Sequence, residues 1–141
     1  LVVKKGSKYA NATSLADFAG AKVTAQLNTF HYSVIDQIPG VEKQAAMDNF
    51  PAMRVALQAG TIDAYVSELP EAISAQAANS DFVMVKLTDG FKASPEDTQT
   101  AVGVKKDSPL TKQINEALKT ISSEERQQIM QEAIKNQPAA E

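Results

Sequence analysis

Two short segments of the sequence carry polar groups at places where a small charged ligand could be held. The segment from Gln26 to Phe30 follows a predicted strand at 22–26, and the pair Ser67-Glu68 directly follows another at 62–66. Backbone N–H groups near Phe30, together with the Thr29 hydroxyl, could hold a carboxylate. The Glu68 carboxylate would suit an ammonium group. Together these groups predict a receptor for a zwitterion.

A purely structural explanation of the same residues stays open. Thr29 fits the cap of the short helix that is predicted to follow it, and Glu68 fits an acid in the first turn of a helix. Position alone does not separate these explanations from ligand binding.

The remaining reactive side chains do not form a catalytic or metal-binding set. His31 is the single histidine and the chain has no cysteine, so we interpret His31 as a surface or pocket-rim residue. No G-x-S-x-G motif is present. The acid pairs Asp63 with Glu68 and Glu124 with Glu125 are explained by strand ends and helix starts. The sequence therefore predicts no enzyme, no catalytic residues, no metal and no cofactor.

Composition places the chain among ordinary globular proteins and excludes several partners. It has 141 residues, of which 43% are hydrophobic and 22% charged, with a formal net charge of −3. The basic residues are scattered, so nucleic acid is not expected as a partner. No apolar run approaches the roughly 20 residues that a membrane helix needs.

The elements that would position these groups alternate between strands and helices. Further strands are predicted at 1–3, 41–46, 82–85 and 100–104, and the stretch 88–98 reads as a loop. A short helix is predicted at 14–20, opened by a capping box, and longer ones at 49–59 and 70–78, the last capped by Ser67. The fold class is therefore α/β, a mostly parallel sheet covered by helices on both faces, beginning with a β-α-β unit.

The last third of the chain reads as two helices with no strand after them. One has the apolar stripe Leu110, Ile114, Leu118 and Ile121. Ser122-x-x-Glu125 opens the second, which carries Ile129, Met130, Ala133 and Ile134.

Several of these segments, in this order, resemble the polar amino-acid family of solute-binding proteins that serve ABC importers, whose fold is that of periplasmic binding proteins. The resemblance covers the entry strand at 1–5, the 14–20 helix, the segment 23–30, the Ala-Leu-x-x-Gly-x-Ile-Asp-Ala motif within 56–66, and the stretches 102–106 and 114–118. It implies that Thr29 and the N–H of Phe30 hold the ligand carboxylate and that Glu68 holds its α-amino group. It also implies a ligand contact for Gln26.

The sequence departs from the family pattern at two site positions. Asn28 stands where the family usually has glycine, and asparagine tolerates the left-handed conformation of that turn. Glu68 stands where aspartate is commoner, and its longer side chain would shift the bound ammonium group or hold it at the same position with a rotated side chain.

The resemblance also implies a domain organisation. Residues 1–104 would form one α/β ligand-binding lobe with connector strands at both ends, and 105–141 would be a helical pair that belongs to a first lobe. That lobe would precede Leu1, so we expect a chain truncated at its N-terminus. The helical pair would then pack on a second copy of the chain or fold back on its own lobe, and ligand affinity would be weak.

The function implied is capture of a polar L-amino acid and its delivery to the membrane permease of an ABC importer. The location implied is the periplasm or the extracellular face of the membrane, with a lipid anchor. The alternative is a non-catalytic amino-acid sensor domain of the same fold within a larger receptor. An α/β enzyme with an unrecognised site is the third interpretation, and the lack of a nucleophile–base pair argues against it.

Overall fold

The protein is described by a computed structural model, which covers residues 1–136. The chain divides into two compact units, Leu1–Asp97 and Thr98–Glu141. The final five residues of the predicted helical segment 105–141 lie outside the described residues.

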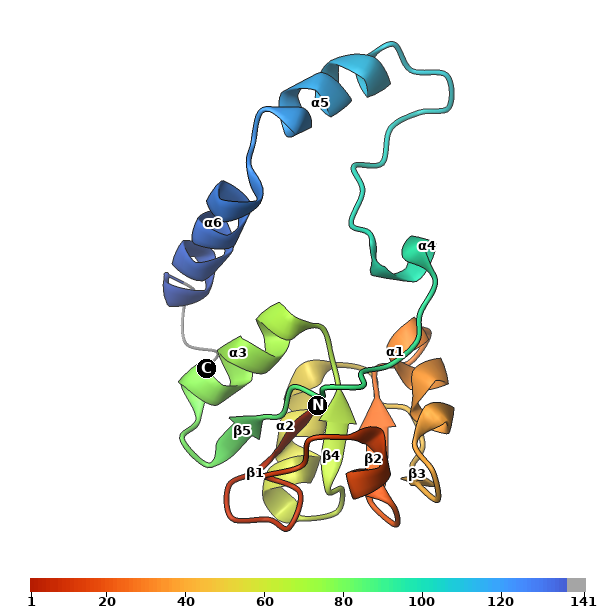
Figure 1. The fold of residues 1–141 in the computed structure, drawn as a ribbon, viewed down its shortest axis with the longest axis vertical. Helices are drawn as coiled ribbons and strands as arrows, with labels where there is room; N and C mark the ends of the chain where they lie inside the picture. Colours follow the sequence, from red (N-terminus) through yellow and green to blue (C-terminus); the bar gives the residue numbers. More distant parts are fainter. Residues whose placement is uncertain (137–141) are drawn as a thin grey trace. The chain divides into compact units, whose positions relative to one another are not determined.

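The first unit is built on one five-stranded sheet with the strand order β3-β2-β4-β1-β5 (Figure 1). The strands are β1 (Val2–Lys4), β2 (Lys22–Ala25), β3 (Glu42–Lys43), β4 (Ala64–Val66) and β5 (Phe82–Met84). Strand β2 pairs in parallel with β3 and β4, whereas β1 pairs antiparallel with both β4 and β5. Four of these five strands therefore run in one direction, and β1 runs against them.

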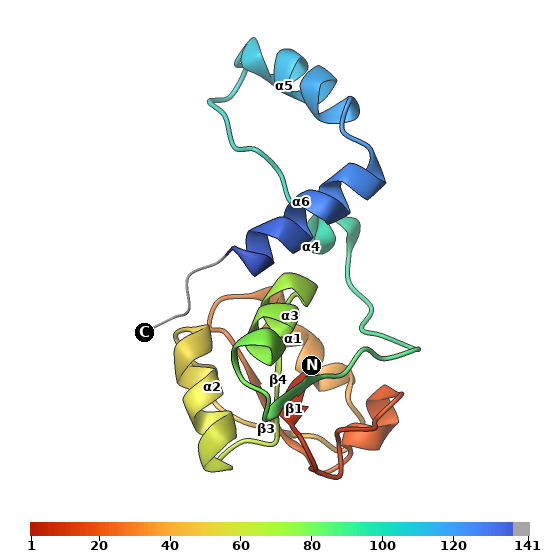
Figure 2. The same ribbon diagram turned by 90° about the vertical axis from the view of Figure 1, so that its left-hand side faces the viewer.

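Helices cover both faces of this sheet (Figures 1 and 2). Between the strands lie the 3-10 helices η1 (Leu15–Phe18) and η2 (Val34–Gln37) and the α-helices α1 (Phe30–Ser33), α2 (Phe50–Ala59) and α3 (Leu69–Ala78). Alternate strand residues face opposite sides: Val3, Val23 and Ala64 join a core with Phe18 and Ile35. Val2 and Tyr65 join a second core with the helices α2 and α3. The predicted α/β class is confirmed.

Helix α2 illustrates how local signals set an element. The Asn49 side chain accepts a hydrogen bond of 2.9 Å from the Ala52 N–H and so caps the helix. Met53 and Leu57 are completely buried. Gly60 ends the helix in the left-handed conformation, with φ of 73°. The helix predicted at 49–59 is confirmed.

The structure corrects the prediction of an initial β-α-β unit. The element after β1 is the 3-10 turn η1, and its Asp17 carboxylate accepts hydrogen bonds from the N–H groups of Thr13 and Ser14, which directly precede it. Strand β1 does not pair with β2, because β4 lies between them. A β-α-β unit requires two parallel strands, and β1 is antiparallel to its neighbours.

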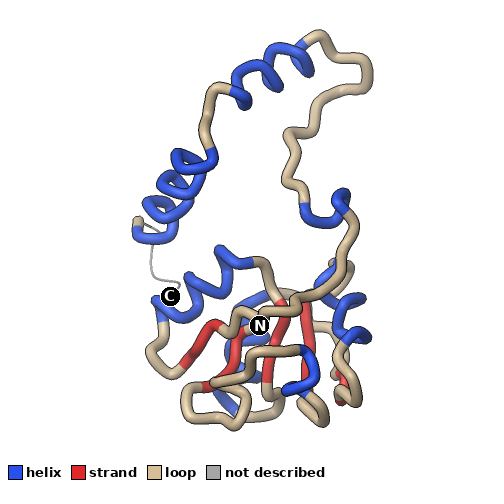
Figure 3. The backbone as a smooth tube through the Cα atoms, viewed as in Figure 1, coloured by secondary structure: helices blue, strands red, loops and turns tan. Residues whose placement is uncertain are grey.

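Three further boundaries also differ from the prediction (Figure 3). The strand predicted at 41–46 is limited to Glu42–Lys43, since it pairs only with the first half of β2. Ser67 does not cap α3: Glu68 occupies the N-cap position, and the Ser67 hydroxyl donates to the Glu68 carbonyl at 3.2 Å. The predicted loop at 88–98 contains the short helix α4 (Pro95–Thr98).

The strand predicted at Thr100–Val104 is wrong. Residues 99–105 form no regular structure, and Val102 and Val104 are exposed. A strand is stabilised by hydrogen bonds to a neighbouring strand, and no segment within residues 1–136 pairs with this one.

The second unit contains the two predicted helices, α5 (Leu110–Lys119) and α6 (Ser123–Lys135). The capping box at the start of α6 is confirmed, with Ser122 and Glu125 exchanging hydrogen bonds of 2.8 and 3.1 Å. The Arg126 guanidinium donates to the Leu118 and Ile121 carbonyls and so ties the two helices together. No described residue of either helix is buried.

Candidate ligand site

The carboxyl ends of β2 and β4 lie side by side and place the predicted binding residues at one edge of the sheet (Figure 1). The two strands are parallel neighbours, with Ala25 opposite Val66. Gln26 and the turn to Thr29 follow β2, and Glu68 follows β4 after a single residue. The structure therefore brings the Thr29–Phe30 turn and Glu68 to the same edge, where helix N-termini also converge.

The turn after β2 has the conformation that a close backbone approach requires. Asn28 has φ of 60°, one of two non-glycine residues with positive φ in the described part of the chain. Thr29 then stands at the N-cap position of α1, in an extended conformation. The Tyr32 N–H donates to the Thr29 carbonyl at 3.2 Å, whereas the N–H groups of Phe30 and His31 come too early in α1 to have an acceptor within the helix.

The Thr29 side chain does not act as a helix cap. Its hydroxyl donates to the Gln26 carbonyl at 2.7 Å, and it accepts no capping hydrogen bond from α1. This bond closes the turn that carries Asn28. In this state the backbone N–H groups, rather than the hydroxyl, are the donors available to an anion.

Gln26 contributes to the turn from its other side. Its side-chain amide donates to the Asp48 carbonyl at 3.1 Å, and its backbone forms a bridge to Met47. In this structure the Gln26 side chain therefore fastens the turn to the segment before α2.

Glu68 has the N-cap position of α3, but its carboxylate makes no capping hydrogen bond. The side chain is half exposed, and its Oε2 lies 3.6 Å from Nε2 of His31. The Glu68 carboxylate therefore lies close to His31 and does not bind the N–H groups of its own helix.

Sequence reasoning missed the position of His31. Its imidazole is mostly enclosed, with 15% of the side chain exposed, and packs against the Phe30 ring with centroids 4.2 Å apart. Burial lowers the pKa of His31, and the nearby Glu68 carboxylate opposes this by raising it. The only signal in the sequence was its place two residues after Thr29.

A second cluster of charged and polar side chains, which the sequence did not reveal, links helix α2 to helix α3. The Arg54 guanidinium on α2 donates to both carboxylate oxygens of Glu71 on α3, at 2.8 and 2.9 Å. The Tyr65 hydroxyl donates to the same carboxylate at 3.3 Å. Burial, and then the Glu71 charge, raise the pKa of Tyr65, which keeps its hydroxyl protonated as a donor.

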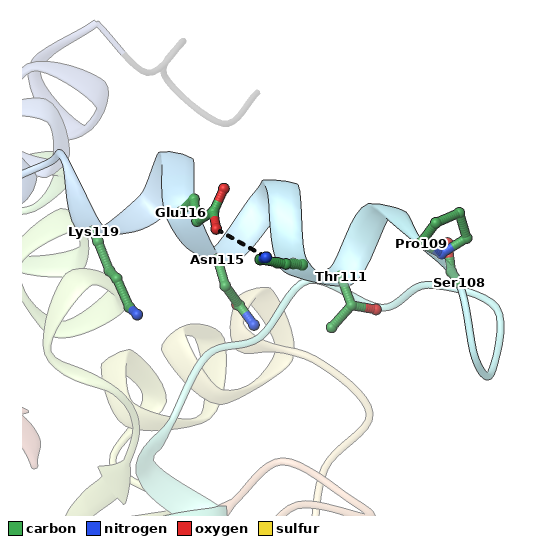
Figure 4. Close-up of a pocket in the computed structure, with 7 residues that line it drawn as sticks. Ser108, Pro109, Thr111, Asn115, Glu116 and Lys119 are labelled. Carbon is green, nitrogen blue, oxygen red and sulfur yellow. Dashed lines mark ion pairs between the residues drawn. The ribbon is translucent and has the colours of Figure 1, made fainter.

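Two cavities are lined by residues other than the four predicted binding residues. One cavity, of about 220 Å³, lies in the first unit and is lined mainly by apolar side chains. Its lining includes Ser67 and Leu69, which flank Glu68 in the sequence. The other, of about 500 Å³, follows one side of α5 from Ser108 to Lys119, and Figure 4 shows its side chains projecting from that helix. Neither is lined by any of the four predicted binding residues.

No group of three or more His, Asp or Glu side chains among residues 1–136 is placed to hold a metal ion. In the same part of the chain, no helix combines the length and apolar character that a membrane crossing requires.

Comparison with solved structures identifies the fold. An amino acid ABC transporter substrate-binding protein from Streptococcus pneumoniae, bound to L-arginine, matches with a TM-score of 0.77 and 22% identity over 95% of this chain and 55% of that one. The fold of the first unit is one lobe of a periplasmic-binding-protein fold. Domain 2 from TmArgBP matches at 0.54 and 27% identity, covering 62% of this chain and 95% of its own.

A ligand-binding core shares the same fold. The GluR0 ligand-binding core in complex with L-glutamate matches with a TM-score of 0.67 and 16% identity, over 95% of this chain and 57% of that one. The chain thus spans a little over half the length of the Streptococcus pneumoniae and GluR0 structures. No protein-family model and no curated protein matches the sequence.

Proposed function

We propose that the chain is part of a non-catalytic solute-binding protein that captures a polar L-amino acid for an ABC importer. The observation that carries the proposal is the shared edge at the ends of β2 and β4, where the Thr29–Phe30 turn and the Glu68 carboxylate meet. The Phe30 N–H and its neighbours would hold the ligand carboxylate, and Glu68 its ammonium group. Gln26 would contribute by holding the turn, or by releasing Asp48 to reach the ligand.

The solved structures support this proposal at the level of fold. Several are named as amino-acid ABC transporter substrate-binding proteins or as arginine-binding proteins. Delivery to a membrane permease follows from that role. So does a location in the periplasm or on the extracellular face, with a lipid anchor, and recovery of the native protein from the cytosolic fraction would contradict this location.

Binding of amino acids to the 141-residue chain tests the proposal directly. We expect one or a few polar L-amino acids to shift the amide resonances of residues 26–31 and 67–69 in a saturable way. We expect dissociation constants weaker than micromolar, because the matched structures have a further lobe that would enclose the ligand. Twenty amino acids without a saturable shift at these residues would contradict the proposal, and micromolar or tighter binding would contradict the role given to the other lobe.

A sensor domain within a larger receptor is the second candidate. The match to the GluR0 ligand-binding core favours it, because that structure binds L-glutamate and is named as a ligand-binding core rather than as a transporter protein. Both candidates bind an amino acid at the same edge. Signalling modules encoded in the same gene would favour the sensor, and a neighbouring permease gene would favour the importer.

The helical pair is proposed to belong structurally to another lobe or to pack on a second copy of the chain. Leu110, Leu118, Ile129 and Met130 are each more than two-fifths exposed on α5 and α6. Burying a large apolar side chain is worth about 1.5–3 kcal/mol, so such a surface favours a partner. We expect light scattering to detect a homodimer, and a monomer whose amides at 110–135 exchange rapidly would contradict the packing.

A further inference from the structure

The imidazole of His31 and the carboxylate of Glu68 face each other across the candidate site. Nε2 of His31 lies 3.6 Å from Oε2 of Glu68. His31 lies in α1, the helix that follows β2, and Glu68 lies two residues after the parallel neighbour β4. The contact therefore lies between the two segments that are proposed to hold the two ends of an amino acid.

We propose that His31 determines when the site accepts a ligand, because its imidazolium and the ligand's ammonium group compete for the Glu68 carboxylate. A neutral imidazole leaves the carboxylate to the ligand. A protonated imidazole occupies it as an ion pair. This inference rests on the proposed function, since it requires an amino acid whose ammonium group binds at Glu68.

The surroundings of the pair leave Glu68 as the charged group that acts on His31. The Phe30 ring covers one side of the imidazole and carries no charge. The other charged groups on the packed elements are held elsewhere: Asp36 of η2 by Lys43 at 2.8 Å, and Glu71 of α3 by Arg54. Strand β2 carries Lys22, at its opposite end.

The direction of the pH dependence follows from these contacts. Burial of the imidazole favours its neutral form, so the pKa of His31 lies below its ordinary value. At neutral pH the carboxylate is then available to a ligand. As the pH falls through the pKa of His31, the imidazolium forms and ligand affinity falls with it. By linkage, a bound ammonium group lowers the pKa of His31 further and expels its proton.

The single histidine makes the test direct. Because His31 is the only histidine in the chain, the imidazole resonances in an NMR spectrum can be assigned to it directly. We expect Glu68→Gln to lower the pKa of His31 in the free protein. The matched control is Asp81→Asn, which removes the same charge from an exposed residue at the start of β5, at the other edge of the sheet, and should leave the pKa unchanged. An unchanged pKa in Glu68→Gln would overturn the inference.

Ligand binding supplies the second half of the test, with L-arginine and L-glutamate as probes. For the probe that binds, we expect the dissociation constant to rise about threefold or more between about pH 7.5 and about pH 5.5. In His31→Gln the rise should disappear. If the dissociation constant rises equally in His31→Gln, the rise does not come from His31, and the inference is overturned.

The two failures are distinguishable. If neither these probes nor any other amino acid binds at either pH, the proposed function fails, and the inference fails with it even where Glu68→Gln shifts the pKa of His31. If an amino acid binds and His31→Gln does not change the pH dependence of its dissociation constant, the proposed function stands and the inference alone is wrong.

Discussion

Replacing Glu68 with alanine is expected to weaken amino-acid binding by about 2–5 kcal/mol, which would remove saturable binding to this chain. The reason is that the ligand's ammonium group would enter the site without its counter-charge. Glu68 makes no capping hydrogen bond, and its side chain is half exposed, so its loss should leave the fold intact. Nuclear magnetic resonance titration with the amino acid that binds the unsubstituted chain measures the change.

A matched variant separates this effect from a general loss of charge. Asp81→Ala removes one exposed acid from the opposite edge of the sheet and should leave the dissociation constant within about twofold of its original value. Unfolding by urea should give the same midpoint for both variants. Affinity that survives in Glu68→Ala would remove Glu68 from the binding site.

Replacing Glu71 with alanine is expected to destabilise the first unit by about 3–5 kcal/mol. This change leaves the Arg54 guanidinium, with 21% of its side chain exposed, without its carboxylate, and the Tyr65 hydroxyl without its acceptor. Because the whole stability of a domain is about 5–15 kcal/mol, this loss should be visible as a large shift of the urea midpoint.

Two comparisons show whether the unpaired charge is the cause. The double variant Arg54→Met with Glu71→Met should recover much of the stability, since apolar residues can replace a buried ion pair at little cost. Asp36→Ala breaks the pair with Lys43, in which the acid is 69% exposed, and should cost less than about 1 kcal/mol. Equal losses of stability in Glu71→Ala and in Asp36→Ala would show that the burial of these ion pairs does not determine their contribution to the free energy of unfolding.

Elements defined by contacts within a few residues could be predicted from the sequence. Asn49 and Gly60 bound α2 through hydrogen bonds and a backbone conformation that each involve one turn of chain. Ser122 and Glu125 open α6 in the same way. Such signals depend on residue type and spacing, and both can be read directly.

Elements that need a distant partner could not be predicted reliably. Val102 and Val104 favour a strand by type, but residues 99–105 find no neighbouring strand in the described chain. Val2 and Val3 do form a strand, although they pair with residues 64–65 and 83–84 rather than with β2. Residue type indicates a tendency to be extended, and the pairing is decided by segments far along the sequence.

The candidate site divides along the same line. The shared edge of the Thr29 turn and Glu68 follows from parallel neighbouring strands, which the alternation of elements predicted. The contact of His31 with Glu68 depends on the direction of two side chains from different elements. The direction of a side chain is set by packing, here against Phe30, and the sequence does not contain that information directly.

The place of β1 between β4 and β5 gives the two units different folding requirements. Val2 is synthesised well before its neighbours in the sheet, Tyr65 and Met84. On the ribosome, the sheet of the first unit therefore cannot close until the chain has grown past β5, and each of these pairings must first close a long loop. The helices α5 and α6 need only contacts within a few turns, such as those of Arg126 with Leu118 and Ile121. Strand β1 thus remains without a partner in the sheet while most of the first unit is made.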